Sequence, residues 1–221
     1  VSQEDVWFSE TVDLTPYKSA NVKIRFRSKV SASDEDANVD NVKIVGIADG
    51  PNATPVANAA GPYVMNEGGS VTLTGAGSTD SDGTIATYAW DLDGDGQYDD
   101  ATGMTTSFTT TSSGTHIVGL QVTDNRGATD TTTATVTVNN VAPTANAGSD
   151  QNGFTGTVVN VSAASSRDPG NDIVSYAWDL DGDGQYDDAT GVNASLTASS
   201  VGTYVVGLQV TDADGAVSTD S

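Results

Sequence analysis

The residues best suited to chemistry lie in an acidic, glycine-rich stretch, residues 88–103, that returns unchanged at residues 176–191. It places five carboxylates within ten residues, from Asp91 to Asp100. Carboxylates this close together repel one another unless a cation neutralises them. The stretch therefore predicts a cation site, and its return after 88 positions predicts a repeated domain.

The spacing of these residues matches the first half of a calcium-binding loop of the EF-hand type. Such a loop has acidic residues at positions one, three and five, glycine at six and a backbone carbonyl ligand at seven. Asp91, Asp93 and Asp95 occupy the acidic positions, and a glycine and a glutamine follow them. Position twelve is Thr102 instead of glutamate, so the remaining oxygens must come from later aspartates or a neighbouring loop. The alternative is a solvated acidic turn. The predicted Ca²⁺ ligands are Asp91, Asp93, Asp95, Gln97, Asp99, Asp100, Asp179, Asp181, Asp183, Gln185, Asp187 and Asp188.

Charge and hydropathy exclude several classes of function. The chain has 221 residues and a formal net charge of -22, which disfavours nucleic acid and anionic membrane surfaces as partners. It has no run of eighteen apolar residues, so we expect no membrane insertion. Cysteine is absent, so small domains need a stabilising element other than disulfides, and calcium would serve.

Groups for catalysis are scarce. His116 is the only histidine, and with no cysteine the chain offers neither a Ser-His-Asp nor a Cys-His arrangement, nor the usual zinc ligands. Glu67 is the only glutamate after position 50, and no carboxylate pair marks a cleft for glycoside hydrolysis. We therefore expect a protein that is not an enzyme.

The composition predicts an all-β fold. Gly, Thr, Ser, Asp, Ala and Val dominate, and no long apolar stripe of helical period occurs. Strands are predicted at residues 71–73, 85–92 and 116–122, where apolar residues alternate with polar ones. The apolar face of the last strand should pack with Trp90 between two sheets.

Residues 1–50 differ from the rest, because they hold six of the eight basic residues. Residues 12–17, 22–27 and 39–44 together resemble the last third of the jelly-roll modules of carbohydrate-binding and MAM-like extracellular domains. The resemblance implies a partial jelly-roll-like β module. A turn-rich segment, residues 49–55, then separates this module from the repeats. The predicted domains are residues 1–50, 51–141 and 142–221.

Five motifs recur in order in the two later domains. They lie in the first copy at residues 55–59, 77–83, 88–91, 114–116 and 120–128. Together they resemble the PKD (polycystic kidney disease) repeat, which implies two tandem immunoglobulin-like β-sandwiches. The family usually has Trp-Asp-Phe-Gly-Asp-Gly where this chain has residues 90–96, so the acidic loop is an elaboration. The resemblance implies an extracellular spacer, an adhesive module or an accessory domain of a secreted hydrolase.

Two further features leave alternatives open. The second copy stops at Ser221, opposite Thr133, so we expect it to lack its last strand, either as a piece of a longer protein or as a subunit completed by another chain. Asp80, Asp82 and Asp168 occupy a turn whose aspartates bind calcium in some members of the family. Here an ordinary turn is the favoured interpretation, because Asp and Gly are common turn formers.

The sequence thus predicts an extracellular, calcium-stabilised structural or adhesive rod, part of a cell-surface, matrix or filament-forming protein. The expected localisation is secreted, extracellular or cell-surface, and the expected partners are calcium and either further copies of the chain or an extracellular polysaccharide. The alternative function is a polysaccharide-binding accessory region of a secreted hydrolase. Tyr98 and Tyr186, within the acidic loops, are its repeated aromatic candidates.

Overall fold

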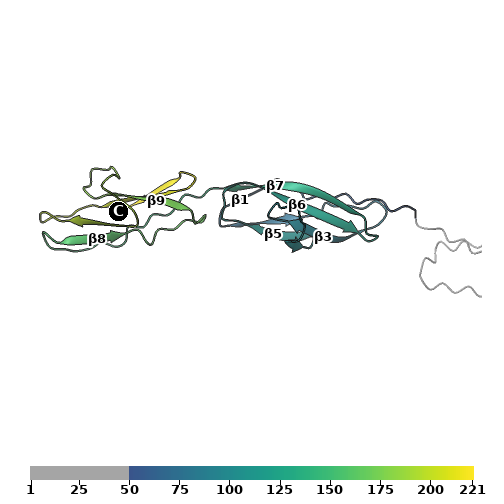
Figure 1. Cartoon of the computed structure of the whole chain (residues 1–221), viewed down its shortest axis with the longest axis horizontal. Helices are drawn as coiled ribbons and strands as arrows, with labels where there is room; N and C mark the ends of the chain where they lie inside the picture. The colour runs from purple at the N-terminus through teal and green to yellow at the C-terminus, as the bar shows by residue number, and fades with distance from the viewer. Residues whose placement is uncertain (1–49) are drawn as a thin grey trace, which may run out of the picture. The chain divides into compact units, whose positions relative to one another are not determined.

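The computed structural model describes residues 50–221, and residues from Asp49 onward form one structural unit (Figure 1). The jelly-roll resemblance of residues 1–50 therefore lies outside the described residues, apart from Gly50. Every regular element in the described part is a β-strand, which confirms the all-β prediction. Within these residues there is no helix long and apolar enough to cross a membrane.

The first repeat (residues 51–141) forms two sheets that face each other across a core. The larger sheet has the order β1-β7-β6-β3-β4, with β1 parallel to β7 and the other neighbours antiparallel. The smaller sheet pairs β2 with β5. The strands are β1 (Tyr63–Asn66), β2 (Ser70–Thr74), β3 (Ile85–Asp91), β4 (Ala101–Thr102), β5 (Thr105–Thr109), β6 (Gly114–Asp124) and β7 (Thr129–Asn139).

Trp90 on β3 is the centre of this core. Its side chain is fully buried, and Leu120 lies directly opposite it on β6. Val118 and Val122, on the same strand as Leu120, are also fully buried, as the two-residue alternation of a strand predicts. The indole nitrogen donates a hydrogen bond of 2.9 Å to the carbonyl of Gly103, so the one polar atom of the ring is satisfied. The predicted role of Trp90 is confirmed.

The second repeat (residues 142–221) has the same plan with a smaller core. One sheet has the order β10-β9-β12-β13, and a second pairs β11 with β8. Trp178, Leu208 and Val210 repeat the buried positions of the first copy. The strands are β8 (Val158–Ser162), β9 (Ile173–Asp179), β10 (Ala189–Thr190), β11 (Asn193–Thr197), β12 (Gly207–Asp212) and β13 (Val217–Asp220).

The expectation that the second copy lacks its last strand is wrong. A four-residue strand, β13, pairs antiparallel with β12, with Leu208 opposite Asp220. A tight turn before it, in which Gly215 has φ of 87°, brings the chain back far enough for pairing. β13 is shorter than the eleven-residue β7, and residues 142–221 contain no counterpart of β1, whose partners in the first repeat are Val136–Asn139 of β7.

In each repeat the ring of His116 or Tyr204 contacts a backbone carbonyl four residues earlier in the chain. The Tyr204 hydroxyl donates to the carbonyl of Ser200 at 3.1 Å, and His116 Nε2 lies 2.9 Å from the carbonyl oxygen of Ser112. Both contacts span four residues, like the tyrosine corner of immunoglobulin-like domains. Hydrogen bonds from Ser200 and Ser199 lower the pKa of Tyr204 to about 8. His116 therefore has a structural position.

Candidate metal centres

The first acidic loop connects β3 to β4 and is organised by Asp91, the last residue of β3. Its side chain is only 6% exposed. One carboxylate oxygen accepts a hydrogen bond of 2.7 Å from the amide of Gly94, and the other accepts one of 2.9 Å from Gly96. Both glycines have positive φ, 77° and 86°, which turns their amides back towards the strand end. The local sequence thus folds the loop around one buried carboxylate.

The next two acidic residues lie beside Asp91. Asp93 accepts a hydrogen bond from the amide of Asp95, and Asp95 accepts one from the amide of Gln97. One carboxylate oxygen from each of Asp91, Asp93 and Asp95 can be chosen so that all three lie within 4.8 Å of one another. Three negative oxygens at this separation are suited to a shared divalent cation.

The other two predicted carboxylate ligands of this loop, Asp99 and Asp100, do not join that group. Asp100 turns back on the loop, where one of its oxygens accepts hydrogen bonds from the amides of Leu92, at 2.6 Å, and Asp93, at 3.2 Å. Asp99 is exposed and lies outside the group of three carboxylates. The Gln97 side chain donates to Asp95 at 3.1 Å, a contact that sequence spacing did not predict. Asp100 therefore shapes the loop.

The second loop, between β9 and β10, repeats this geometry. Asp179 is 6% exposed and accepts hydrogen bonds from Gly182, at 2.7 Å, and Gly184, at 2.9 Å. Asp179, Asp181 and Asp183 form the second group of carboxylates within 4.8 Å. The equivalents of the remaining residues behave alike. Asp188 accepts from the amides of residues 180 and 181, Gln185 contacts Asp183, and Asp187 lies outside the group.

The tyrosine of each loop packs on a glycine of the neighbouring strand. A Cβ placed on Gly119 would lie 3.0 Å from Cε1 of Tyr98, and one on Gly207 would lie 3.0 Å from Cε1 of Tyr186. Glycine at these positions therefore leaves room for the ring. Both tyrosines are half-buried and brace the acidic loop against the sheet.

A second acidic region of the first repeat lies where the β6–β7 turn meets the turn of Asp80 and Asp82, and we call it the corner of the repeat. Burial alone would raise the pKa of Asp124, but hydrogen bonds from the Arg126 amide, the Asn52 side chain and the Ala128 amide hold this pKa below its ordinary value. The Arg126 guanidinium forms a 2.6 Å ion pair with Asp82. The predicted turn of Asp80 and Asp82 thus carries its own cation.

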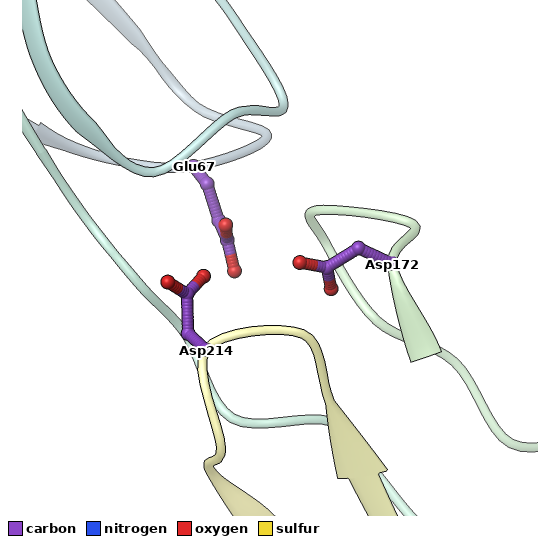
Figure 2. Close-up of side chains that lie close together, drawn as sticks. All are labelled: Glu67, Asp172 and Asp214. Carbon is purple, nitrogen blue, oxygen red and sulfur yellow. The ribbon is translucent and has the colours of Figure 1, made fainter. Parts of the chain in front are cut away.

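The equivalent corner of the second repeat is more acidic, and sequence reasoning did not single it out as a site. Glu67, Asp172 and Asp214 form a third group of carboxylates within 4.8 Å (Figure 2). Burial, followed by contact with Asp168 and the charges of Glu67 and Asp212, raises the pKa of Asp172. Aligning the repeats at their offset of 88 gives the signal that was missed, since Asp214 replaces Arg126.

Asn140, which lies just before the second repeat, also contacts this corner. Asn140 donates a hydrogen bond of 3.0 Å to Asp212, as Asn52 does to Asp124 in the first repeat. This hydrogen bond is the largest cause of the lowered pKa of Asp212. Burial opposes it, and hydrogen bonds from the amides of residues 214–216 add to it.

Both repeats match a known domain family. The profile of the PKD domain matches residues 52–138 and 140–221. The PKD1 domain of Vibrio anguillarum Epp is 40% identical, with coverage of 40% of this chain and 96% of that chain and a TM-score of 0.33. The PKD1 domain of the Vibrio cholerae metalloprotease PrtV is 34% identical, with coverage of 39% and 98% and a TM-score of 0.31.

A further solved structure, of carbohydrate-binding modules from the β-sandwich superfamily, is 24% identical, with coverage of 74% of this chain and 56% of that chain and a TM-score of 0.37. Family membership rests on the profile match, which falls on both repeats. Because the two matched segments together make up more than half of the 221 residues, the chain belongs to the PKD domain family.

Proposed function

We propose that the two PKD domains form a calcium-stabilised structural or adhesive region of an extracellular or cell-surface protein. The observation that carries this proposal is the repeated acidic loop. In each repeat the same local geometry brings three carboxylates within 4.8 Å of one another. Family membership supports a modular role, because the resemblance to PKD repeats implies a spacer or adhesive domain.

Calcium fits these loops better than other common ions. All the side-chain ligands are oxygens, which excludes a preference for zinc or copper. Asp93 and Asp95 are exposed and leave room for coordinating water. Ca²⁺ accepts six to eight oxygens in flexible geometry, whereas Mg²⁺ needs a nearly ideal octahedron. Extracellular modules bind calcium with dissociation constants of roughly 0.1 to 1 mM, so such sites are occupied only outside cells.

The energetic role of the ion follows from the small cores. The second repeat buries only five hydrophobic residues in its cluster, and the chain has no cysteine to form disulfides. At about 1 mM free calcium, a site with a dissociation constant of about 0.1 to 1 mM stabilises the folded state by about 0.4 to 1.4 kcal/mol. That is a useful fraction of the stability of a small domain, which is about 5 to 15 kcal/mol.

We infer that the described residues serve structure and binding, without catalysis. The ring of His116, the only histidine, is engaged with the carbonyl of Ser112. The many carboxylates lie in loops and turns, where backbone amides already hold several of them. Polysaccharide binding and filament assembly stay predictions, which a sugar array and negative-stain images of the calcium-loaded chain would test.

The proposal is tested by calcium calorimetry on the whole chain after treatment with a chelator. Asp93→Ala and Asp181→Ala should each reduce the binding stoichiometry by about one, because each removes a central carboxylate of one group. Asp150→Ala is the matched control, because Asp150 is exposed and belongs to none of the three groups. An unchanged stoichiometry in both loop variants would contradict the proposal.

A further inference from the structure

Three carboxylates from both repeats converge where the first repeat meets the second. Glu67 lies in the turn between β1 and β2, Asp172 directly precedes β9, and Asp214 lies in the turn between β12 and β13. Figure 2 shows their carboxylates pointing towards one another. We propose that Glu67, Asp172 and Asp214 bind a further Ca²⁺ ion that joins the two repeats.

The strongest support is the burial of Glu67 and the missing hydrogen-bond partner of one of its oxygens. Its side chain is only 3% exposed, and it points into the cluster (Figure 2). One oxygen, Oε1, accepts a 2.9 Å hydrogen bond from the amide of Val141 in the linker. The other, Oε2, is buried and has no hydrogen-bond partner. A buried carboxylate oxygen without a partner is costly, and a cation bound beside it would remove that cost.

Other unpartnered oxygens gather at the same corner. Among the described residues, seven buried side-chain nitrogen or oxygen atoms lack a hydrogen-bond partner, and five of these belong to Glu67 or to the corner residues Asn140, Asp168 and Asp172. The remaining two, on Asn52 and Asp80, lie at the equivalent corner of the first repeat. Native proteins leave few such atoms unsatisfied, so their concentration at one place indicates a missing ligand.

Comparison of the two repeats shows what kind of ligand is missing. At the corner of the first repeat, Arg126 provides a positive charge to Asp82 and donates to the carbonyl of Gly50. In the second repeat Asp214 takes the place of Arg126, and Asp172 takes that of Thr84. A guanidinium is therefore replaced by a carboxylate, and a second carboxylate is added. The corner has lost its own cation and requires one from solution.

The arginines of the described part do not supply this charge. Arg126 is bound at its own corner, and Arg167 donates to the carbonyls of Ala164 and Ser166. The donors that hydrogen-bond to Glu67 and Asp214 are uncharged. Ser113 of the first repeat donates a 2.7 Å hydrogen bond to Asp214, and the Val141 amide holds Glu67.

The backbone is shaped so that Glu67 can reach the second repeat. Gly170 stands where the first repeat has Asp82. A Cβ at Gly170 would lie 2.7 Å from Oε2 of Glu67 and 3.0 Å from an oxygen of Asp168, so any side chain there would displace the glutamate. In turn, a Cβ at Gly68 would lie 2.9 Å from the carbonyl oxygen of Pro169. The two turns fit closely because both lack side chains at the contact.

The chemistry of the site favours calcium. Its donors are carboxylate oxygens on three separate turns, and Asp214 is exposed, so water can complete the coordination. A bound ion would connect the turn after β1 to two turns of the second repeat. The joint between the repeats would then be firm with calcium and looser without it. This inference is independent of the two acidic loops, which lie within single repeats.

The test uses the whole chain carrying Asp93→Ala and Asp181→Ala, so that both loop sites are removed. Calcium calorimetry on this parent is compared with the same chain carrying Glu67→Gln. Glutamine keeps an oxygen that can accept from Val141, so the variant should remain folded while losing the negative charge. We expect the stoichiometry to fall by about one calcium per chain. Asp150→Asn, which changes an exposed carboxylate outside the cluster, should leave it unchanged.

A second variant, Asp214→Arg, restores the charge pattern of the first repeat. It should abolish the same calcium site and raise the melting temperature in chelator, because the corner would again carry its own cation. Hydrogen exchange of the Val141 amide should slow with calcium in the parent and be insensitive to calcium in Glu67→Gln. Equal stoichiometry in the parent and in Glu67→Gln would overturn the inference. That result would say nothing against the loop sites, because they are tested in the chain that still contains Asp93 and Asp181. The two proposals therefore fail separately.

Discussion

Replacing Asp181 by alanine separates the metal role of the acidic loop from its structural role. Asp181 is exposed, and its carboxylate accepts one hydrogen bond within the loop, of 3.1 Å, from the Asp183 amide. In chelator we expect its loss to cost about 0.5 kcal/mol or less, because an exposed hydrogen bond has little net value. At about 1 mM calcium the loss should grow by about 0.4 to 1.4 kcal/mol, since the site would no longer bind.

Asp179→Ala provides the contrast. Asp179 is 6% exposed and accepts two amide hydrogen bonds, so its removal leaves the loop without its organiser. Hydrogen bonds to charged groups contribute about 1.5 to 3 kcal/mol each, so we expect the loss of two to cost about 3 to 6 kcal/mol even in chelator. Both variants should lose the calcium contribution, but only Asp179→Ala should lose substantial stability in chelator.

The assay is urea unfolding followed by tryptophan fluorescence, with and without calcium. The whole chain, Asp179→Ala and Asp181→Ala are measured side by side. The metal role of Asp181 is refuted if its variant loses equal stability in chelator and in calcium. The structural role of Asp179 is refuted if its variant matches the parent in chelator.

Three further predictions concern the framework of the first repeat. Trp90→Ala should lose about 3 to 5 kcal/mol in urea unfolding, because the ring is fully buried; a loss below about 1 kcal/mol would contradict its central place in the core. Gly119→Val should lose about 1 to 3 kcal/mol and weaken calcium binding by the first loop, because a side chain there collides with Tyr98. Gly202→Val, at a site with open space around it and no positive φ, is the control for a general effect of removing glycine, and unchanged calorimetry of Gly119→Val would count against the bracing role of Tyr98. The pKa of Asp124 is lowered in the folded state, so its ionised form contributes stability above the ordinary pKa of 3.8, and that contribution is lost as pH falls below this value; the stability difference between the parent and Asp124→Asn should shrink from pH 7 to pH 3, and a constant difference would contradict the assignment.

Much of the framework follows from the sequence because it depends on short-range pattern. The repeat offset, the alternation around Trp90 and the Asp-Gly spacing of the loops are local, and the structure places each of these features as expected. The inward turn of Asp100 was missed because carboxylates that bind amides and carboxylates that bind metal look alike in sequence. The short strand β13 was missed because the last strand was expected to begin after the position of Thr133, whereas β7 already begins at Thr129.

The junction cluster could not be found from spacing. Glu67 and Asp172 lie 105 positions apart in the chain, in different repeats, and meet only when the turn after β1 docks on the second repeat. Sequence periodicity describes each repeat by itself and carries no information about this docking. The exchange of Arg126 for Asp214 was visible in the alignment of the repeats, but its meaning depends on the position of Glu67.

Calcium binding by the two acidic loops is tested most sharply by calorimetry on the whole chain after chelator treatment, with a thermal melt of the same sample. Both acidic loops should bind calcium, Asp93→Ala and Asp181→Ala should each remove about one ion, and calcium should raise the melting temperature of the parent. The absence of binding heat together with an unchanged melting temperature would contradict this expectation and reduce the loops to solvated turns.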